Sequence, residues 1–151
     1  MTAHEITDQL QRIASADDFA ARSAELTDAW SSAGASLETV EPILRFIEDH
    51  PAIDFGMPGP LVHFVERFYG KGYEQKLIES LQRKPTLPTA WMLNRVINGT
   101  KSPDEKQRLV ATMKHARLNA LADQVTVQRI NRFLERLSHS RRSAMEGFMV
   151  G

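Results

Sequence analysis

The sequence predicts an all-α fold of about eight short amphipathic helices, and three observations support this. Apolar residues recur every three or four positions along most of the chain, which is the period of a helix with one buried face. No segment alternates apolar and polar residues as a half-buried strand does. Proline, glycine and capping residues divide the chain into segments too short for the long seams of a four-helix bundle. We therefore favour an irregular array of helical hairpins over a compact bundle.

The first two helices follow from apolar spacing and capping residues. Ile6, Leu10 and Ile13 form one stripe and predict a helix over residues 3–14. Ser15 is the expected N-cap of the second helix, which would place Asp17 and Asp18 in its first turn, where negative charge suits the helix dipole.

The third helix is expected to start at Ser36 or Thr39 and to run to about Asp49. Pro42 favours the later start, because proline is tolerated only in the first turn. Residues 51–60 then hold three prolines and two glycines and form the strongest break in the chain. The break is either a linker or, because Ile53 and Phe55 lie within it, a packed loop.

Five further helices are expected beyond the break. Their predicted extents are Pro60 to Gly70, Tyr73 to about Arg83, Thr86 or Thr89 to Asn98, Pro103 to about Leu118, and a last helix from Ala122 or Asp123. Armadillo and HEAT repeats are arrays of this kind with units of about 40–47 residues, but the uneven helix starts here make any repeat degenerate. We expect one domain over residues 1–151, with a flexible tail at residues 139–151.

Composition excludes several classes of protein. The chain has no cysteine, which excludes disulfides, thiolate metal sites and cysteine nucleophiles. No apolar run approaches the roughly 18 residues of a membrane helix, and the N-terminus lacks the features of a signal peptide, so a cytoplasmic protein is expected. None of the five histidines forms an HExxH pair, and no phosphate-binding loop or nucleophile elbow is present. We therefore predict no enzyme, no metal and no cofactor.

The formal net charge of zero is a cancellation between two unlike regions. Residues 1–54 hold three basic and eleven acidic residues, a net charge of −8, and the remaining residues carry +8. For any single charge, a solvated helix face is the simpler explanation. The segregation of the whole set indicates a charged partner, or contact between the two regions.

Two polar stripes are candidates for a binding surface. His63, Glu66 and Arg67 share one side of the fourth helix. We prefer a structural interpretation over acid–base catalysis, with Glu66 paired to a neighbouring helix and His63 partly buried.

On the sixth helix Trp91, Asn94, Arg95 and Asn98 share one face. Trp and Arg dominate binding hot spots, so this face is a candidate recognition surface. A structural interpretation explains the pattern about as well: Trp91 fills the core, and the side chains of Asn94 and Asn98 bond to loop backbone.

The central segment resembles small all-α immunity proteins of bacterial polymorphic toxin and contact-dependent inhibition systems. The residues that carry the resemblance are Asp54 to Glu66 (DFGMPGPLVHFVE), with Arg83 to Thr86 and Trp91 to Arg95. The resemblance implies a cytoplasmic protein that binds one cognate toxin domain and blocks it. The expected partner-binding residues are Asp17, Asp18, Glu25, Asp28, Asp54, His63, Glu66, Trp91, Asn94, Arg95 and Asn98.

An alternative is a nucleic-acid-binding or regulatory adaptor. Arg129, Arg132 and Arg136 form a basic stripe on the last helix that would contact phosphates. The neutral total charge and the acidic N-terminal region make nucleic acid the less favoured partner. No membrane partner is expected, and the sequence makes no prediction of oligomeric state.

Overall fold

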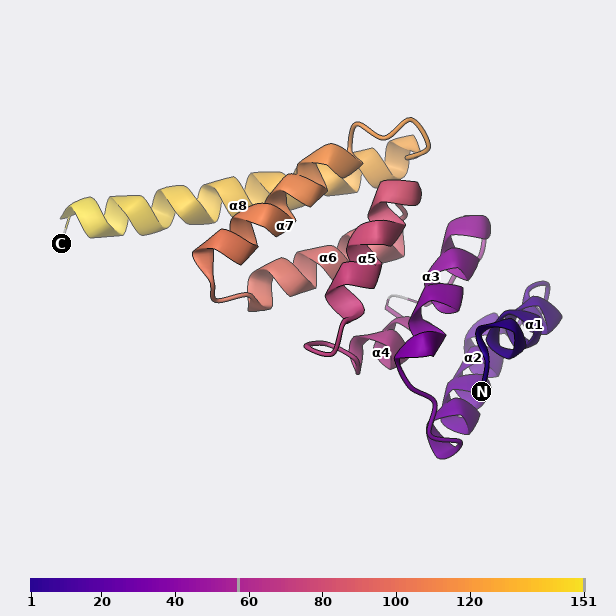
Figure 1. Ribbon diagram of the computed structural model, residues 1–151. Coiled ribbons are helices and arrows are strands. Elements are labelled where there is room, and N and C mark those ends of the chain that lie inside the picture. The colour runs from indigo at the N-terminus through magenta and orange to yellow at the C-terminus, as the bar shows by residue number, and fades with distance from the viewer. Residues whose placement is uncertain (57, 151) are drawn as a thin grey trace.

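The computed structural model of the chain describes residues 1–56 and 58–150, with side chains described up to residue 140. Over this range the fold consists of α-helices and one short 3-10 helix, without strands, which confirms the all-α prediction (Figure 1). The elements are α1 Ala3–Ile13, α2 Phe19–Ser32, η1 Leu37–Thr39, α3 Val40–Asp49, α4 Pro60–Glu66, α5 Tyr73–Arg83, α6 Leu87–Gly99, α7 Pro103–Ala116 and α8 Gln124–Val150.

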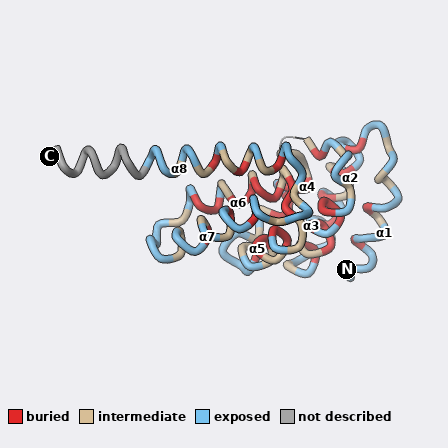
Figure 2. The backbone as a smooth tube through the Cα atoms, turned by 90° about the horizontal axis from the view of Figure 1, so that it is seen from above, coloured by how far each residue is buried: buried red, intermediate tan, exposed pale blue. Residues whose placement is uncertain are grey.

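Successive helices pair as hairpins, and the hairpins stack in chain order. The pairs are α1 with α2, α3 with α4, α5 with α6 and α7 with α8. Helices α1, α3, α5 and α7 contact one another in sequence and form a first layer, while α2, α4, α6 and α8 do the same in a second layer (Figures 1 and 2). This two-layer order is the helical-hairpin array that the sequence predicts.

The core lies between the two layers, where buried residues gather in Figure 2. Trp30 of α2 is fully buried, and its Nε1 donates a hydrogen bond of 2.6 Å to Oε1 of Gln9 on α1. The Trp30 ring also meets Phe64 of α4 edge to face, with 5.5 Å between ring centroids. One aromatic side chain therefore joins three helices.

The segment between α3 and α4 is a packed loop and not a linker. Phe55 is buried against Phe19 of α2 and Phe46 of α3, with ring centroids 5.5 and 6.1 Å apart. Gly59 has a φ of +87°, and a Cβ atom there would lie 1.7 Å from the carbonyl oxygen of Phe55. The loop therefore needs glycine at this position, and Pro60 follows as the first residue of α4.

Most predicted helix starts are confirmed, but the start of α2 is wrong. Its N-cap is Asp18 and not Ser15, so Asp17 and Asp18 precede the helix instead of lying in its first turn. Asp18 forms no side-chain capping bond, and its Oδ1 accepts a hydrogen bond of 3.4 Å from Nε of Arg22. The helix begins where Phe19 enters the aromatic cluster, so tertiary packing decides the boundary.

α4 ends at Glu66, four residues before the expected Gly70, and the last helices differ from the prediction by one or two residues. α7 ends at Ala116, before the expected Leu118, and α8 begins at Gln124 directly after Asp123. The expected flexibility of residues 139–151 stays a prediction, because side chains from residue 141 onward lie outside the described part.

Asp123 holds the start of α8. Its Oδ1 accepts a hydrogen bond of 2.7 Å from the backbone N–H of Thr126. This bond, together with one from the Thr126 side chain, holds the pKa of Asp123 below its ordinary value. The carboxylate is therefore the stabilising form of this cap.

Replacing Asp123 with alanine is expected to lower the free energy of unfolding by about 1 kcal/mol, because the cap is lost. The wild-type advantage should be present above a pH of about 4, the pKa of an unfolded aspartate, and should vanish as the pH falls through the lower pKa of the folded state. Urea denaturation at pH 7 and pH 2.5 tests both parts. A difference between variant and wild type that is the same at both pH values would contradict this role.

Because the hairpins stack in chain order, the acidic and basic regions of the sequence lie at opposite ends of the array. The acidic residues 1–54 build α1, α2 and α3, at the opposite end of the array from α7 and α8 (Figure 1). Among the described side chains, the ion pairs that cross between the two regions all come from Arg83, with Glu48 at 2.8 Å and Glu41 at 3.9 Å. Contact between the regions therefore neutralises little of the charge.

Candidate protein-binding surface

The outer side of α4 and α6 carries a linked group of three predicted site residues. Nε of Arg95 on α6 lies 2.9 Å from Oε2 of Glu66 on α4, in an ion pair between neighbouring helices of the second layer. The same guanidinium lies over the Trp91 ring, 4.8 Å from its centroid. The predicted pairing of Glu66 with a neighbouring helix is confirmed, and Trp91, Arg95 and Glu66 form one unit, here called the Trp–Arg–Glu cluster.

The structural interpretation fails for His63 on α4 but holds in part for Trp91 on α6. His63 is exposed, so the prediction of a partly buried imidazole is wrong; its neighbours Val62 and Phe64 occupy the buried face of the short helix α4. Trp91 is half-buried and packs against the edge of the core while its ring carries Arg95. Trp91 therefore packs against the core and also takes part in the surface pair with Arg95, so both interpretations of this residue hold in part.

A hollow of about 440 Å³ lies beside the Trp–Arg–Glu cluster, here called the tyrosine hollow. Its lining residues are Glu66, Tyr69, Tyr73, Arg95, Val96, Asn98 and Gly99. Tyr73 is almost fully buried, and its hydroxyl has no hydrogen-bond partner within the described part of the chain. Burial, and next the nearby Glu66 carboxylate, raise the pKa of the Tyr73 phenol well above its ordinary value, so the group stays protonated.

The two tyrosines were not among the predicted site residues. In the sequence, Tyr73 marks only the start of a helix after Gly72, and Tyr69 lies in the turn before it. Nothing local in the sequence indicates that the Tyr73 hydroxyl is buried without a partner. The hollow forms only where α4, the turn after it, α5 and α6 come together.

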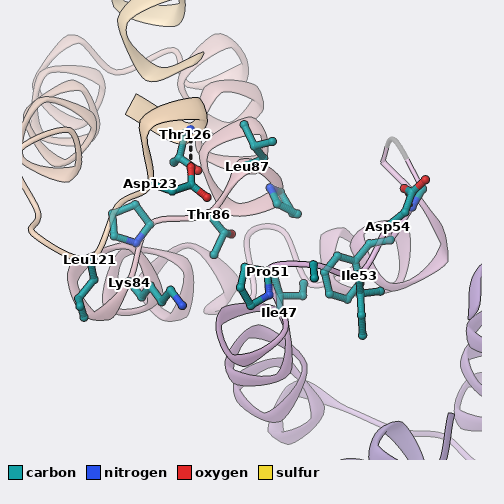
Figure 3. A pocket seen from close by; sticks show the side chains of 15 residues that line it. Ile47, Pro51, Ile53, Asp54, Lys84, Thr86, Leu87, Leu121, Asp123 and Thr126 are labelled. Carbon is teal, nitrogen blue, oxygen red and sulfur yellow. Dashed lines mark hydrogen bonds between the residues drawn. The ribbon is translucent and has the colours of Figure 1, made fainter. Parts of the chain in front are cut away.

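A second hollow of about 410 Å³ opens at the edge where the loops between paired helices meet (Figure 3). Its wall is mostly apolar and includes Ile47, Pro51, Ile53, Leu87 and Leu121, with Asp54, Lys84 and Asp123 among its charged residues. We call it the loop-edge hollow. Residues 54–56 line one side and residues 84–88 another, so two segments that are distant in the sequence share it.

Asp54 lies between the loop-edge hollow and a third one. Its Oδ1 accepts a hydrogen bond of 3.0 Å from the backbone N–H of Gly56, and its carboxylate points away from the middle of the loop-edge hollow (Figure 3). On its other side Asp54 lines a hollow of about 570 Å³ together with Asp17 and Asp18, here called the acidic hollow. The structure thus brings three predicted site residues together from two separate loops.

The other acidic candidates stand apart from this hollow. Glu25 and Asp28 are exposed on α2 and do not line the hollow. Within the described residues, no group of three or more histidine, aspartate or glutamate side chains is arranged to hold a metal ion. The acidic hollow is therefore a negatively charged surface formed by Asp17, Asp18 and Asp54.

One of the two interpretations of the sixth-helix stripe has Asn94 and Asn98 bonded to loop backbone, and the described residues show no such bonds. Side-chain hydrogen bonds in and directly after α6 come from Thr89, Arg95 and Thr100, and across the described part none comes from Asn94 or Asn98. Asn98 lines the tyrosine hollow, and both amides line another hollow between α6, α7 and α8. With respect to the described side chains, both amide groups are therefore free to bind a partner.

The basic stripe of α8 is only partly presented to solvent. Arg132 and Arg136 are exposed, whereas Arg129 is half-buried.

In the part of the chain that the structure covers, no helix combines the length and the apolar character needed to cross a membrane. No known family model matches the chain, and no curated protein or solved structure matches it either, so the surface itself carries the functional proposal.

Proposed function

We propose that this chain is a cytoplasmic immunity-type protein that binds a cognate bacterial toxin domain and blocks it. The observation that carries the proposal is that the two segments resembling immunity proteins, residues 54–66 and 83–95, lie side by side. They meet at the loop-edge hollow and again at the ion pair between Glu66 and Arg95. Residues that are separated in the sequence thus come together at two places along α6.

The chemistry of this surface suits protein recognition. Trp91 and Arg95 are of the residue types that dominate hot spots, and their stacking holds both side chains in place before a partner arrives. The loop-edge hollow offers an apolar cavity for a partner side chain. In this proposal the protein acts by covering the toxin and takes no part in catalysis.

The acidic hollow gives the proposal an electrostatic component. Asp17, Asp18 and Asp54 present three carboxylates at the negatively charged end of the array. A toxin with a basic substrate groove, such as a nuclease, would be attracted to this end, because complementary charge accelerates encounter. We expect the charge to act mainly on the association rate.

The direct test is co-expression with the C-terminal domain of a large secreted toxin encoded beside this gene. A stable complex that purifies together and lacks toxin activity supports the proposal. The Arg95→Glu variant places a negative charge beside Glu66 and is expected to weaken the complex by more than about tenfold. Failure of wild-type protein to bind or protect would overturn the proposal.

The electrostatic component has its own prediction. Reversing Asp17 and Asp18 to lysine is expected to slow association with the toxin domain by about tenfold at low salt, and the difference should shrink at high salt. A control variant reverses Asp8 and Glu135, which are exposed, change the net charge equally and lie outside the acidic hollow. Stopped-flow kinetics measure both variants. Equal slowing in the two would show that net charge, and not the acidic hollow, attracts the partner.

The alternative of a nucleic-acid adaptor is favoured by one observation, the exposure of Arg132 and Arg136 on α8. Retention on a heparin column should then persist to moderate salt and fall steeply as salt rises. Elution only at very low salt would count against this alternative.

A further inference from the structure

A hollow of about 490 Å³ lies between α6, α7 and α8, toward the positively charged end of the array. Lys106 and Lys114 of α7 line it from one side and Arg136 of α8 from another. Asn94 and Asn98 of α6 also contribute to its wall. We call it the basic hollow.

The side chains that the structure describes do not neutralise the three cationic groups of the basic hollow. Among the described side chains, none of them forms an ion pair, whereas the adjacent Arg108 is paired with Glu105 at 3.0 Å. Lys114 and Arg136 are exposed, and Lys106 is half-buried. Three positive charges around one concavity, without an acidic partner among the described side chains, create a local field that attracts anions.

The basic hollow also has an apolar wall. Val110, Leu134 and Leu137 line it and are half-buried, packed against the edge of the core. Val110 lies midway between Lys106 and Lys114 on one stripe of α7, because positions four and eight apart share a helix face. An apolar strip bordered by cations matches an amphipathic partner better than a simple anion.

The spacing indicates the form of the partner. Lys106 and Lys114 lie eight positions apart, which corresponds to about 12 Å along a helix. A partner helix with acidic residues at the same separation and an aliphatic residue between them would place its carboxylates near both lysines and its apolar side chain against Val110. This is recognition of an amphipathic helix by a groove.

We propose that the basic hollow binds an acidic amphipathic segment of a protein partner. Nucleic acid is less favoured, because none of the described residues that line the hollow is aromatic, so they offer no platform for base stacking. This proposal goes beyond toxin binding, since it assigns a second surface whose charge is opposite to that of the acidic hollow. It does not require that the toxin proposal be correct.

The test uses a fluorescently labelled helical peptide of about four turns, with glutamates eight positions apart and leucine midway between them. Fluorescence anisotropy should show saturable binding to the full chain. A peptide with glutamine in place of both glutamates should bind at least about tenfold more weakly. Equal binding of the two peptides would overturn the proposal.

Charge-matched variants locate the site. The double variant Lys106→Gln and Lys114→Gln should weaken peptide binding by at least about tenfold. The control variant Lys101→Gln and Arg132→Gln removes the same charge from exposed positions outside the hollow, and it should stay within about twofold of wild type. Circular dichroism confirms that both variants fold, and an equal loss in the two would overturn the assignment.

Two further measurements separate other occupants. A single-stranded oligonucleotide could bind more tightly than the peptide and lose as much affinity in the double variant Lys106→Gln and Lys114→Gln. That result would overturn the proposal and identify a nucleic-acid site. Sedimentation of the protein alone tests for self-association, because the acidic end of a second copy could also bind the basic hollow. Salt-sensitive self-association that disappears in Lys106→Gln and Lys114→Gln would likewise overturn the proposal.

Discussion

Replacing Glu48 with alanine is expected to lower the free energy of unfolding by about 3 kcal/mol, the typical cost of removing one partner of a buried ion pair. The Glu48 side chain is only 7% exposed and lies between α3 and α5. Its carboxylate accepts hydrogen bonds from Oγ of Ser80 at 2.7 Å and from Nε and an Nη atom of Arg83 at 3.0 and 2.8 Å. Alanine would leave the buried Ser80 hydroxyl and the Arg83 guanidinium without these partners.

The matched control for this change is Glu41→Ala. Glu41 approaches the same guanidinium at 3.9 Å, but its side chain is 39% exposed, so its loss should cost less than about 1 kcal/mol. Urea denaturation monitored by circular dichroism compares both variants with wild type. Equal destabilisation by the two would show that the net attraction to Arg83, and not the buried hydrogen bonds, stabilises the junction of the second and third hairpins.

Local sequence signals predict a helix boundary well where only one residue suits that boundary. α5 was predicted from Tyr73 to about Arg83, because Gly72 precedes it and Pro85 follows it closely. The start of α2 was mispredicted because Ser15, Asp17 and Asp18 are all suitable caps, and propensity does not choose among them. Packing of Phe19 against Phe46 and Phe55 selects the last of them. Tertiary contacts of this kind are invisible to local patterns.

In the candidate surface too, the sequence predicts which residues share a helix face but not which helices come into contact. Helical spacing identified the stripes that contain Glu66 and Arg95, but not that the two side chains pair with each other across helices. The hollows depend on how the hairpins stack, so Tyr73, Lys106 and Lys114 were not predicted as site residues. The charge segregation was visible in the sequence, whereas the meeting of Asp54 with Asp17 and Asp18 required the loops to be placed in space.

Replacing Tyr73 with phenylalanine is expected to raise the free energy of unfolding by about 1–3 kcal/mol, the desolvation cost of a buried polar group left without a partner. The variant removes the Tyr73 hydroxyl, which is buried and unpartnered within the described part of the chain, and keeps the ring that fills the core. Tyr69→Phe is the control. Tyr69 is 49% exposed and lines the same hollow, so its hydroxyl carries little desolvation cost and its removal should leave stability unchanged.

The pH dependence gives this prediction a second, independent readout. An unfolded tyrosine loses its proton near pH 10, whereas the raised pKa keeps the folded Tyr73 protonated. The unfolded state then binds fewer protons, so wild-type stability should fall above about pH 10 by up to about 1.4 kcal/mol per pH unit. Tyr73→Phe lacks this contribution and should lose less stability over the same range. A variant that is no more stable than wild type, with an unchanged alkaline slope, would show that the hydroxyl is already satisfied.

A stabilising substitution at this position also bears on function. Natural proteins keep few buried polar groups without partners, and those that persist call for an explanation. Tyr73 lines the hollow beside Glu66 and Arg95, although its hydroxyl is itself buried. We propose that a bound protein which enters the hollow places an acceptor against this hydroxyl. If so, Tyr73→Phe should make the free protein more stable while weakening its complex with the proposed toxin domain. Tyr69→Phe should leave the stability of the free protein unchanged. Gains in both stability and affinity would instead mark the hydroxyl as a packing defect, and would remove the tyrosine hollow from the binding surface while leaving the Trp–Arg–Glu cluster in place.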